Sequence, residues 1–357
     1  MDKSFSSKRF RNIGVLTIAS VYFLILVGGI VRSTGSGMGC PDWPKCFGMW
    51  VPPTSLQQLP DNYLEVYKQK RILKNERIGK TLQKLGFTDV AREIFAHPSQ
   101  YIETEFNVTK TWIEYVNRLV GVVIGILIFL TVLYALPFRK HDPKIFWGSV
   151  ASFLLVAFQG WLGSLVVSTN LLPEMVTLHM ALSLLLVALL IYVVVRSNRK
   201  RYSSVAVSSS KFIFLLLWGA IIVSFIQIII GTQVREGIDI IAFNMSNQSR
   251  ETWIDQLGTV FPLHRSLSLL VILINVMLAF YIVQLKQRWM NNLMYGILAV
   301  IAIEALLGIV LSYFSIPAFA QPLHLLIGTL LFGLQFLLLI SYFYAQKTRS
   351  PLPHLVA

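Results

Sequence analysis

The sequence predicts an all-α integral membrane protein in which eight transmembrane helices form two pseudo-symmetric four-helix bundles. Composition is the first reason: 55% of the 357 residues are hydrophobic and 13% are charged, whereas soluble domains carry about 25% charged residues. The second reason is that eight apolar runs are each about 19 residues or longer, which is enough to cross a bilayer. The third is a polar–glycine–histidine pattern that occurs in both halves of the chain.

The repeated pattern lies in residues 159–179 and 304–324. In both stretches a polar residue is followed four places on by a glycine, and a histidine follows after the same further interval, as His179 and His324. Equal intervals in two halves of a chain indicate an internal duplication. We therefore expect the two histidines to occupy equivalent places in two similar bundles.

The halves match at two further places. An arginine ends the first span of each half, and a polar residue followed by an arginine opens the second span. These residues are Arg32 and Asn117-Arg118 in the first half, and Arg235 and His264-Arg265 in the second. We expect the halves to be 1–200 and 201–357, because a basic, Ser-rich linker divides the chain there.

Eight spans are expected along the chain. The first follows a polar, basic N-terminus and is too long for the apolar part of a cleaved signal peptide, so we interpret it as a span. A polar loop is expected at 235–260. The expected spans are about 13–31, 112–136, 145–167, 174–195, 212–231, 262–285, 292–312 and 322–345.

Basic residues cluster at the N-terminus, after every second span and at the C-terminus. The positive-inside rule therefore predicts that both termini are cytoplasmic, and we expect a bacterial plasma membrane. Under this topology Asn117, His179, His264 and His324 lie at the outer ends of their spans. The net charge of +14 arises from the clusters, so we expect membrane lipid around the protein and no nucleic-acid partner.

The long connection between the first two spans contains both cysteines. Cys40 and Cys46 lie in a Gly- and Pro-rich loop, on the side of the membrane where disulfides persist. Both a structural disulfide and a redox-active pair fit this loop. An insert at 47–111 follows, and its middle, 63–95, has a rough helical period that predicts an amphipathic segment at the membrane surface.

The histidines suit heme. Two imidazoles from neighbouring helices can fill both axial positions of a heme iron. The second half offers His264 and His324, which is the arrangement of an electron-transfer heme. The first half offers His179 opposite Asn117, whose amide is a poor iron ligand, so we expect a reactive heme with an open position there. The alternative is that each histidine forms hydrogen bonds at the membrane interface.

Charged residues near these positions have two readings each. Glu114 lies one turn before Asn117 and could accept a proton from a substrate, or it could be an acidic residue favoured near a helix N-terminus. Four arginines could pair with heme propionates, or could extend their side chains to the interface. The four are Arg32, Arg118, Arg235 and Arg265.

Two motifs give the chain its resemblance to the heme A synthase family. Gly35-Ser-Gly-Met-Gly-Cys40-Pro-Asp-Trp-Pro-Lys-Cys46 is similar to the first outer loop of that family, and Glu114-Tyr-Val-Asn117-Arg118 is similar to its Glu-x-x-His-Arg motif. The resemblance covers essentially all eight spans. The chain departs from the family where Asn117 replaces histidine, and it has no second cysteine pair at 235–260.

The resemblance implies an activity. Heme O would bind in the N-terminal half as substrate and a b-type heme in the C-terminal half, with His179, His264 and His324 as iron ligands. Oxidation of a ring methyl of heme O to a formyl group would give heme A, with Glu114 as the catalytic acid or base. It also implies heme O synthase and cytochrome oxidase assembly as partners.

Two other functions fit the same residues. One is a non-catalytic di-heme electron carrier within the membrane. The other is a heme-delivery assembly protein that hands on heme without changing it. Unaltered heme after expression with a heme O source would favour either one over the enzyme.

Overall fold

The protein is an all-α integral membrane protein, which confirms the predicted fold class. A computed structural model describes residues 3–346 apart from 85, 87, 90, 93–104, 170, 172, 204–206, 208–209 and 247. Within these residues there is no β-strand, and eight helices are long and apolar enough to cross a membrane. Val122, Leu215 and Leu269 on the outside of the bundle are 61%, 66% and 67% exposed, as expected for side chains that face lipid.

The eight long helices divide equally between the two predicted halves. They extend the expected spans at most of their ends, because flanking polar residues continue the helical backbone beyond the apolar core. In the first half they are α1 (Lys3–Ser33), α4 (Val108–Ala135), α5 (Pro143–Ser168) and α6 (Pro173–Ser197). In the second half they are α8 (Lys211–Asn244), α9 (Val260–Gln284), α10 (Arg288–Tyr313) and α11 (Ala320–Gln346).

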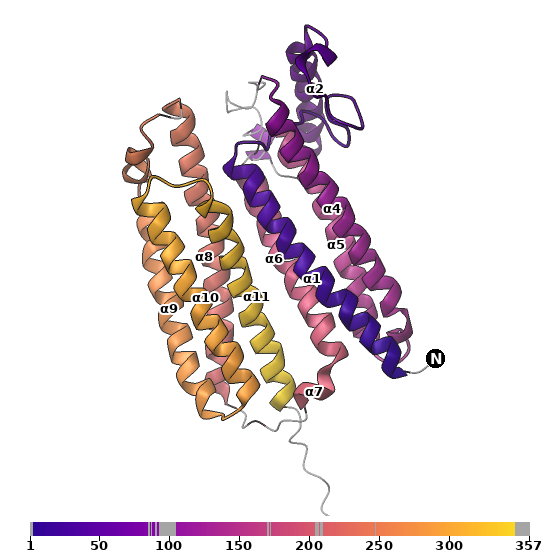
Figure 1. Cartoon of the computed structure of the whole chain (residues 1–357), viewed down its shortest axis with the longest axis vertical. Helices are drawn as coiled ribbons and strands as arrows, with labels where there is room; N and C mark the ends of the chain where they lie inside the picture. The colour runs from indigo at the N-terminus through magenta and orange to yellow at the C-terminus, as the bar shows by residue number, and fades with distance from the viewer. Residues whose placement is uncertain are drawn as a thin grey trace, which may run out of the picture.

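Corresponding helices contact each other in the two halves. The first helix of each half packs against its second and fourth, and the third packs against the fourth, so that α1, α4, α5 and α6 pair as α8, α9, α10 and α11 do. The halves meet where α11 packs against α1 and α6, and where α6 packs against α8 (Figure 1). These pairings support the pseudo-symmetric arrangement, which stays a prediction.

Local sequence explains several helix ends. The side chain of Asn107 accepts a hydrogen bond from Lys110 N at the start of α4, and that of Ser210 accepts one from Ile213 N at the start of α8. Such N-caps satisfy N–H groups that the helix itself leaves unpaired. Pro143 begins α5, a position where the missing N–H of proline is harmless.

Helix α8 is longer than predicted, and the expected polar loop at 235–260 was wrong in its first part. The helix continues to Asn244 because its polar residues are satisfied within it: Arg235 Nη2 lies 2.7 Å from Asp239 Oδ1, one turn away. Ile238 on the same extension is buried in an apolar cluster with Trp253 and Ile316. Short 3-10 turns occupy the rest of the connection, at η4 (Arg250–Thr252) and η5 (Ile254–Gln256).

The insert forms a helix at one end of the bundle. Helix α2 (Tyr63–Lys84) lies there, and the short helix α7 (Arg199–Ser203) lies at the opposite end (Figure 1). The helical prediction for 63–95 is confirmed as far as Lys84, and most of the remaining segment lies outside the described residues. Its place at the membrane surface stays a prediction. The two ends are called the α2 end and the α7 end below.

Candidate heme site

Each histidine of the spans has its ring over a glycine of the preceding helix. A Cβ atom added to that glycine would lie within 4 Å of the Cε1 atom of the ring, so a larger side chain would crowd the imidazole. The three pairs are Gly163 with His179, Gly231 with His264 and Gly308 with His324, at 3.8, 3.2 and 3.6 Å. The glycine therefore leaves the space that each imidazole ring occupies.

A polar residue one turn before each glycine also contacts the histidine. The contacts are Gln159 Nε2 to His179 O at 2.9 Å, Gln227 Nε2 to His264 O at 3.0 Å, and Glu304 Oε1 to His324 Nδ1 at 3.2 Å. Gln227 was not predicted from the sequence. Its signal was present, because Gln227 precedes Gly231 by the same four places as in the repeated pattern.

His264 and His324 face each other across the second half. Their ring centroids are 6.4 Å apart and the ring planes meet at 75°. Metal–nitrogen bonds to histidine are about 2.0–2.1 Å long, so two imidazoles that share one metal have ring centres about 6 Å apart. The pair therefore fits the two axial positions of a heme iron.

The polar atoms around this pair also suit a bound group. In the described part of the chain, His264 Nδ1 and Gln227 Oε1 are buried without a hydrogen-bond partner, which is uncommon in a folded protein. Among the same residues, no group of three or more His, Cys, Asp or Glu side chains could hold a metal ion. Two imidazoles without further ligands suit a heme better than a zinc ion.

The first half departs from the pattern at one position. His179 has its glycine and its glutamine, but Asn117 stands where the second half has His264, and Leu24 stands where it has Gln227. Gly28 corresponds to Gly231, and a Cβ added to it would meet no heavy atom within 4 Å among the described residues. In that same part of the chain Asn117 Oδ1 is buried without a partner. The structure thus leaves open space where the fourth imidazole would be.

Glu114 and Arg118 together hold the cysteine loop. Glu114 is 3% exposed, and its Oε2 atom accepts a hydrogen bond of 2.7 Å from the backbone N–H of Cys40, while Oε1 pairs with Arg118. Arg118 donates to the carbonyl oxygens of Cys40, Asp42 and Lys45 at 3.1, 2.7 and 3.0 Å. These contacts engage both terminal nitrogens of Arg118. They do not test its predicted role with heme propionates, which stays a prediction.

The loop is closed and covered. Cys40 and Cys46 form a disulfide, which both a structural bond and a redox-active pair require, and both residues are 0% exposed. Gly39 lies so close to α4 that an added Cβ would be 2.5 Å from Lys110 O, which explains why glycine is needed there. The ring of Phe47 packs edge-on against Tyr67 of α2, so the insert covers the loop.

A carboxylate links two of the predicted arginines. Asp239 Oδ2 lies 3.0 Å from Arg32 Nη2 and Asp239 Oδ1 lies 2.7 Å from Arg235 Nη2. Arg32 belongs to the first half and Arg235 to the second, so one acidic residue joins the halves. Arg265 lies instead with its guanidinium 5.8 Å from the ring centre of Phe261.

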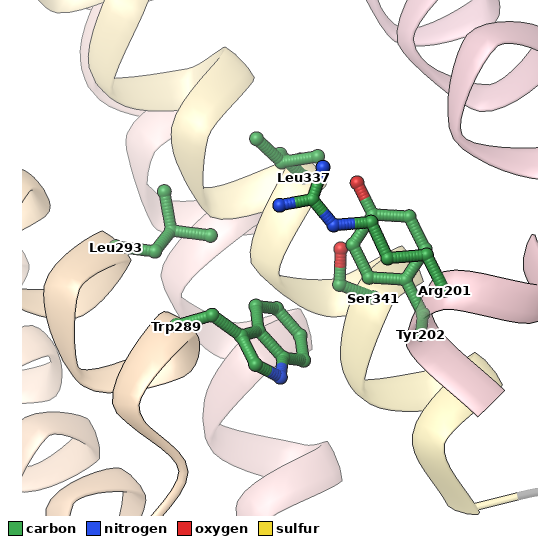
Figure 2. Close-up of a pocket in the computed structure, with 6 residues that line it drawn as sticks. All are labelled: Arg201, Tyr202, Trp289, Leu293, Leu337 and Ser341. Atoms are coloured by element: carbon green, nitrogen blue, oxygen red, sulfur yellow. The ribbon is translucent and has the colours of Figure 1, made fainter. Parts of the chain in front are cut away.

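A pocket at the α7 end is separate from these residues. Its volume is about 330 Å³. Figure 2 shows the guanidinium of Arg201 beside Leu337, while Leu293 and Trp289 line the pocket from another helix. It holds no histidine, and its residues come from α7, α10 and α11, whereas the histidines lie at the α2 end of their helices. The lining residues are Arg201, Tyr202, Trp289, Leu293, Leu337 and Ser341.

The fold and the site define a class of protein: an eight-helix membrane protein with paired imidazoles near one end of its bundle. Within that class, the chain belongs to the family of cytochrome oxidase assembly proteins, because the family model (COX15-CtaA) matches residues 11–84 and 87–336. The match includes all four positions of the histidine pattern.

Several curated relatives carry the name heme A synthase. The chain is 26% identical to that of Shewanella oneidensis over 186 residues, which is 52% of this chain and 45% of the relative. It is 29% identical to that of Nitrosospira multiformis over 181 residues (49% and 44%), and 24% identical to that of Bacillus cereus over 191 residues (53% and 44%). The chain thus spans about half the length of the curated relatives it matches.

Proposed function

We propose that the protein is a heme A synthase, which oxidises a ring methyl of heme O to a formyl group and gives heme A for the maturation of a terminal cytochrome oxidase. One observation carries the proposal: the ring centroids of His264 and His324 lie 6.4 Å apart, so the two imidazoles could hold a heme iron between them. Family membership and the names of the curated relatives support the same reaction.

The two halves would hold different hemes. His264 and His324 would hold a b-type heme in the C-terminal half, and His179 would hold heme O in the N-terminal half with Asn117 on the opposite side. A heme iron supplies the redox chemistry that carbon–hydrogen oxidation needs. Arg32 and Arg235 would bind the propionates of the hemes, because guanidinium groups pair well with carboxylates, as both do with Asp239.

Glu114 would act as the catalytic acid or base. Its carboxylate has a fixed orientation because Cys40 N–H and Arg118 each hold one oxygen. A proton acceptor must be held within hydrogen-bond reach of the group it serves, and Glu114 lies one turn from Asn117 on the same face of α4. The cysteine loop would then order the residue that moves the proton.

The orientation in the membrane follows from charge. Both termini would be cytoplasmic and the heme sites would face the outer side of a bacterial plasma membrane, because basic residues gather at the α7 end. Heme O would come from a heme O synthase in the same membrane, and heme A would pass to the oxidase during its assembly.

Heme extraction tests the proposed reaction. The protein and a Glu114→Gln variant are expressed with a heme O source, and extracted hemes are separated by chromatography. We expect heme A from the native protein and a loss of about 100-fold or more in the variant, the usual effect of removing a general acid or base. Unaltered heme from the native protein would instead favour a di-heme electron carrier or a heme-delivery protein.

A further inference from the structure

We propose that Glu304 is a positioning residue that orients His324 and lowers the reduction potential of the heme in the C-terminal half. The inference rests on heme binding as proposed above, and it does not depend on the reaction. It assigns a role to the one acidic residue among the three polar partners of the histidines, Gln159, Gln227 and Glu304.

The contact itself is the first step. Glu304 Oε1 lies 3.2 Å from His324 Nδ1, an ion-pair distance without hydrogen-bond geometry in the described part of the chain; the carboxylate faces this ring nitrogen and leaves Nε2 for the iron. Metal-bound histidines commonly donate their other N–H to a carboxylate, which fixes the ring and makes it a stronger donor to the metal. A carboxylate in a transmembrane helix is costly and usually has a function.

The space for this contact is provided by a glycine. Gly328 lies one turn after His324 on α11, and a Cβ atom added to it would be 2.9 Å from Glu304 Oε1. Any larger residue at 328 would therefore move the carboxylate. The contact between Glu304 and His324 therefore depends on Gly328 of α11 as well as on the carboxylate of α10.

The first half has a different pair at the same two positions. Gln159 corresponds to Glu304, and Ser183 corresponds to Gly328 because each lies four residues after its histidine. Gln159 Nε2 donates to Ser183 Oγ at 2.7 Å and to His179 O at 2.9 Å. The glutamine amide is therefore held by Ser183 and by the backbone, and it brings no charge to the imidazole.

His264 likewise has a neutral partner. Gln227 Nε2 donates to His264 O at 3.0 Å. Of the three histidines, His324 alone has a carboxylate from the corresponding position. A negative charge close to an axial ligand favours ferric over ferrous iron, and hydrogen bonding to axial ligands is one of the levers that set heme potentials. The asymmetry therefore separates the potentials of the two hemes.

Redox titration of the purified, heme-loaded protein tests the inference. Midpoint potentials of both hemes are followed by absorbance, with EPR of the oxidised protein as a second readout. In Glu304→Gln we expect the ferrous-to-ferric ratio of one heme to rise about tenfold at fixed potential, a shift of about 59 mV for one electron. The other heme keeps its potential.

Three further variants make the test independent of folding defects. Gly328→Ala keeps the carboxylate but pushes it from the ring, and we expect the same upward shift in the same heme. The double variant Gln159→Glu with Ser183→Gly rebuilds the pair in the first half, and we expect the potential of the other heme to fall. Glu304→Asp keeps a carboxylate, so it should shift the midpoint potential less than Glu304→Gln does.

The outcomes separate this inference from the proposed function. Unchanged potentials and EPR signals in both Glu304→Gln and Gly328→Ala, or equal shifts of both hemes, would overturn it. A native protein that binds both hemes but makes no heme A would contradict the enzyme, and the potentials would still decide the role of Glu304.

Discussion

Asn117 occupies in the first half the place that His264 occupies in the second, and Leu24 replaces the corresponding glutamine. The first change removes the imidazole itself, and the second removes the glutamine that contacts it in the other half. The space beside Gly28 is consistent with them, since within the described residues no heavy atom lies within 4 Å of a Cβ built there. At this scale, two halves with similar helices would have the different iron chemistry that the proposed function assigns to them.

The variant Asn117→His tests that difference. An imidazole at this position would approach Gly28 as His264 approaches Gly231, so we expect the iron in the first half to gain a second axial ligand. Carbon monoxide binding by the reduced protein and the high-spin EPR signal should then disappear. The reverse exchange, His264→Asn, is the matched variant, and it should create carbon monoxide binding in the second half. Unchanged binding after Asn117→His would contradict the assignment.

The sequence predicted the residues whose full polar–glycine–histidine spacing repeats, and it missed Gln227 and Asp239, whose intervals to their partners do not. Gln159 and His179 are 20 residues apart, but Gln227 and His264 are 37 residues apart, because the long connection from α8 to α9 lies between them. Asp239 was placed in a loop, and only the extension of α8 brings it between Arg32 and Arg235. Contacts between helices whose connections differ in length leave no repeated interval in the sequence.

At the scale of elements, the cysteine loop and α4 form one unit. Arg118 supplies donors to three loop carbonyls and one carboxylate oxygen. Thr111 adds a hydrogen bond of 2.9 Å from Oγ1 to Gly39 O. Burial and the nearby carboxylate of Asp42 raise the pKa of Tyr67 to about 12, so its hydroxyl stays protonated beside the loop at neutral pH.

Removal of the guanidinium should release this loop. A hydrogen bond to a charged group contributes about 1.5–3 kcal/mol, so in Arg118→Ala we expect the loop to open at least about tenfold more often. Thiol labelling after mild reduction should be faster by a similar factor, because Cys40 and Cys46 are buried in the native protein. Arg265→Ala is the control, since Arg265 occupies the same position in the other half and lies against Phe261. Equal labelling rates in both variants would contradict the role of Arg118 in holding the cysteine loop.

The elements themselves were largely predictable, because eight apolar runs of membrane-spanning length are unambiguous. The end of α8 was not. Arg235, Glu236 and Asp239 resemble the start of a polar loop, but the ion pair between Arg235 and Asp239 and the burial of Ile238 stabilise three further turns. Charge alone could not show whether these residues face water or one another.

At the scale of the whole molecule, the topology can be tested by labelling. The native cysteines form a disulfide, so a new cysteine reports its own side of the membrane. In spheroplasts, an impermeant thiol reagent should label Asp255→Cys between α8 and α9, because the α2 end is expected outside. Lys140→Cys between α4 and α5 should react only after the membrane is permeabilised. The opposite result would invert the orientation.

The bridge through Asp239 has a consequence for how the halves depend on each other. The side chain of Arg32 is 24% exposed, and its carboxylate partner belongs to the other half of the chain. A chain divided at the linker would separate this cation from Asp239, the carboxylate that pairs with it in the described part of the chain. Although their patterns are alike, the two bundles are not interchangeable modules, because the first depends on a carboxylate of the second, whereas Asp239 keeps a partner in its own half through Arg235.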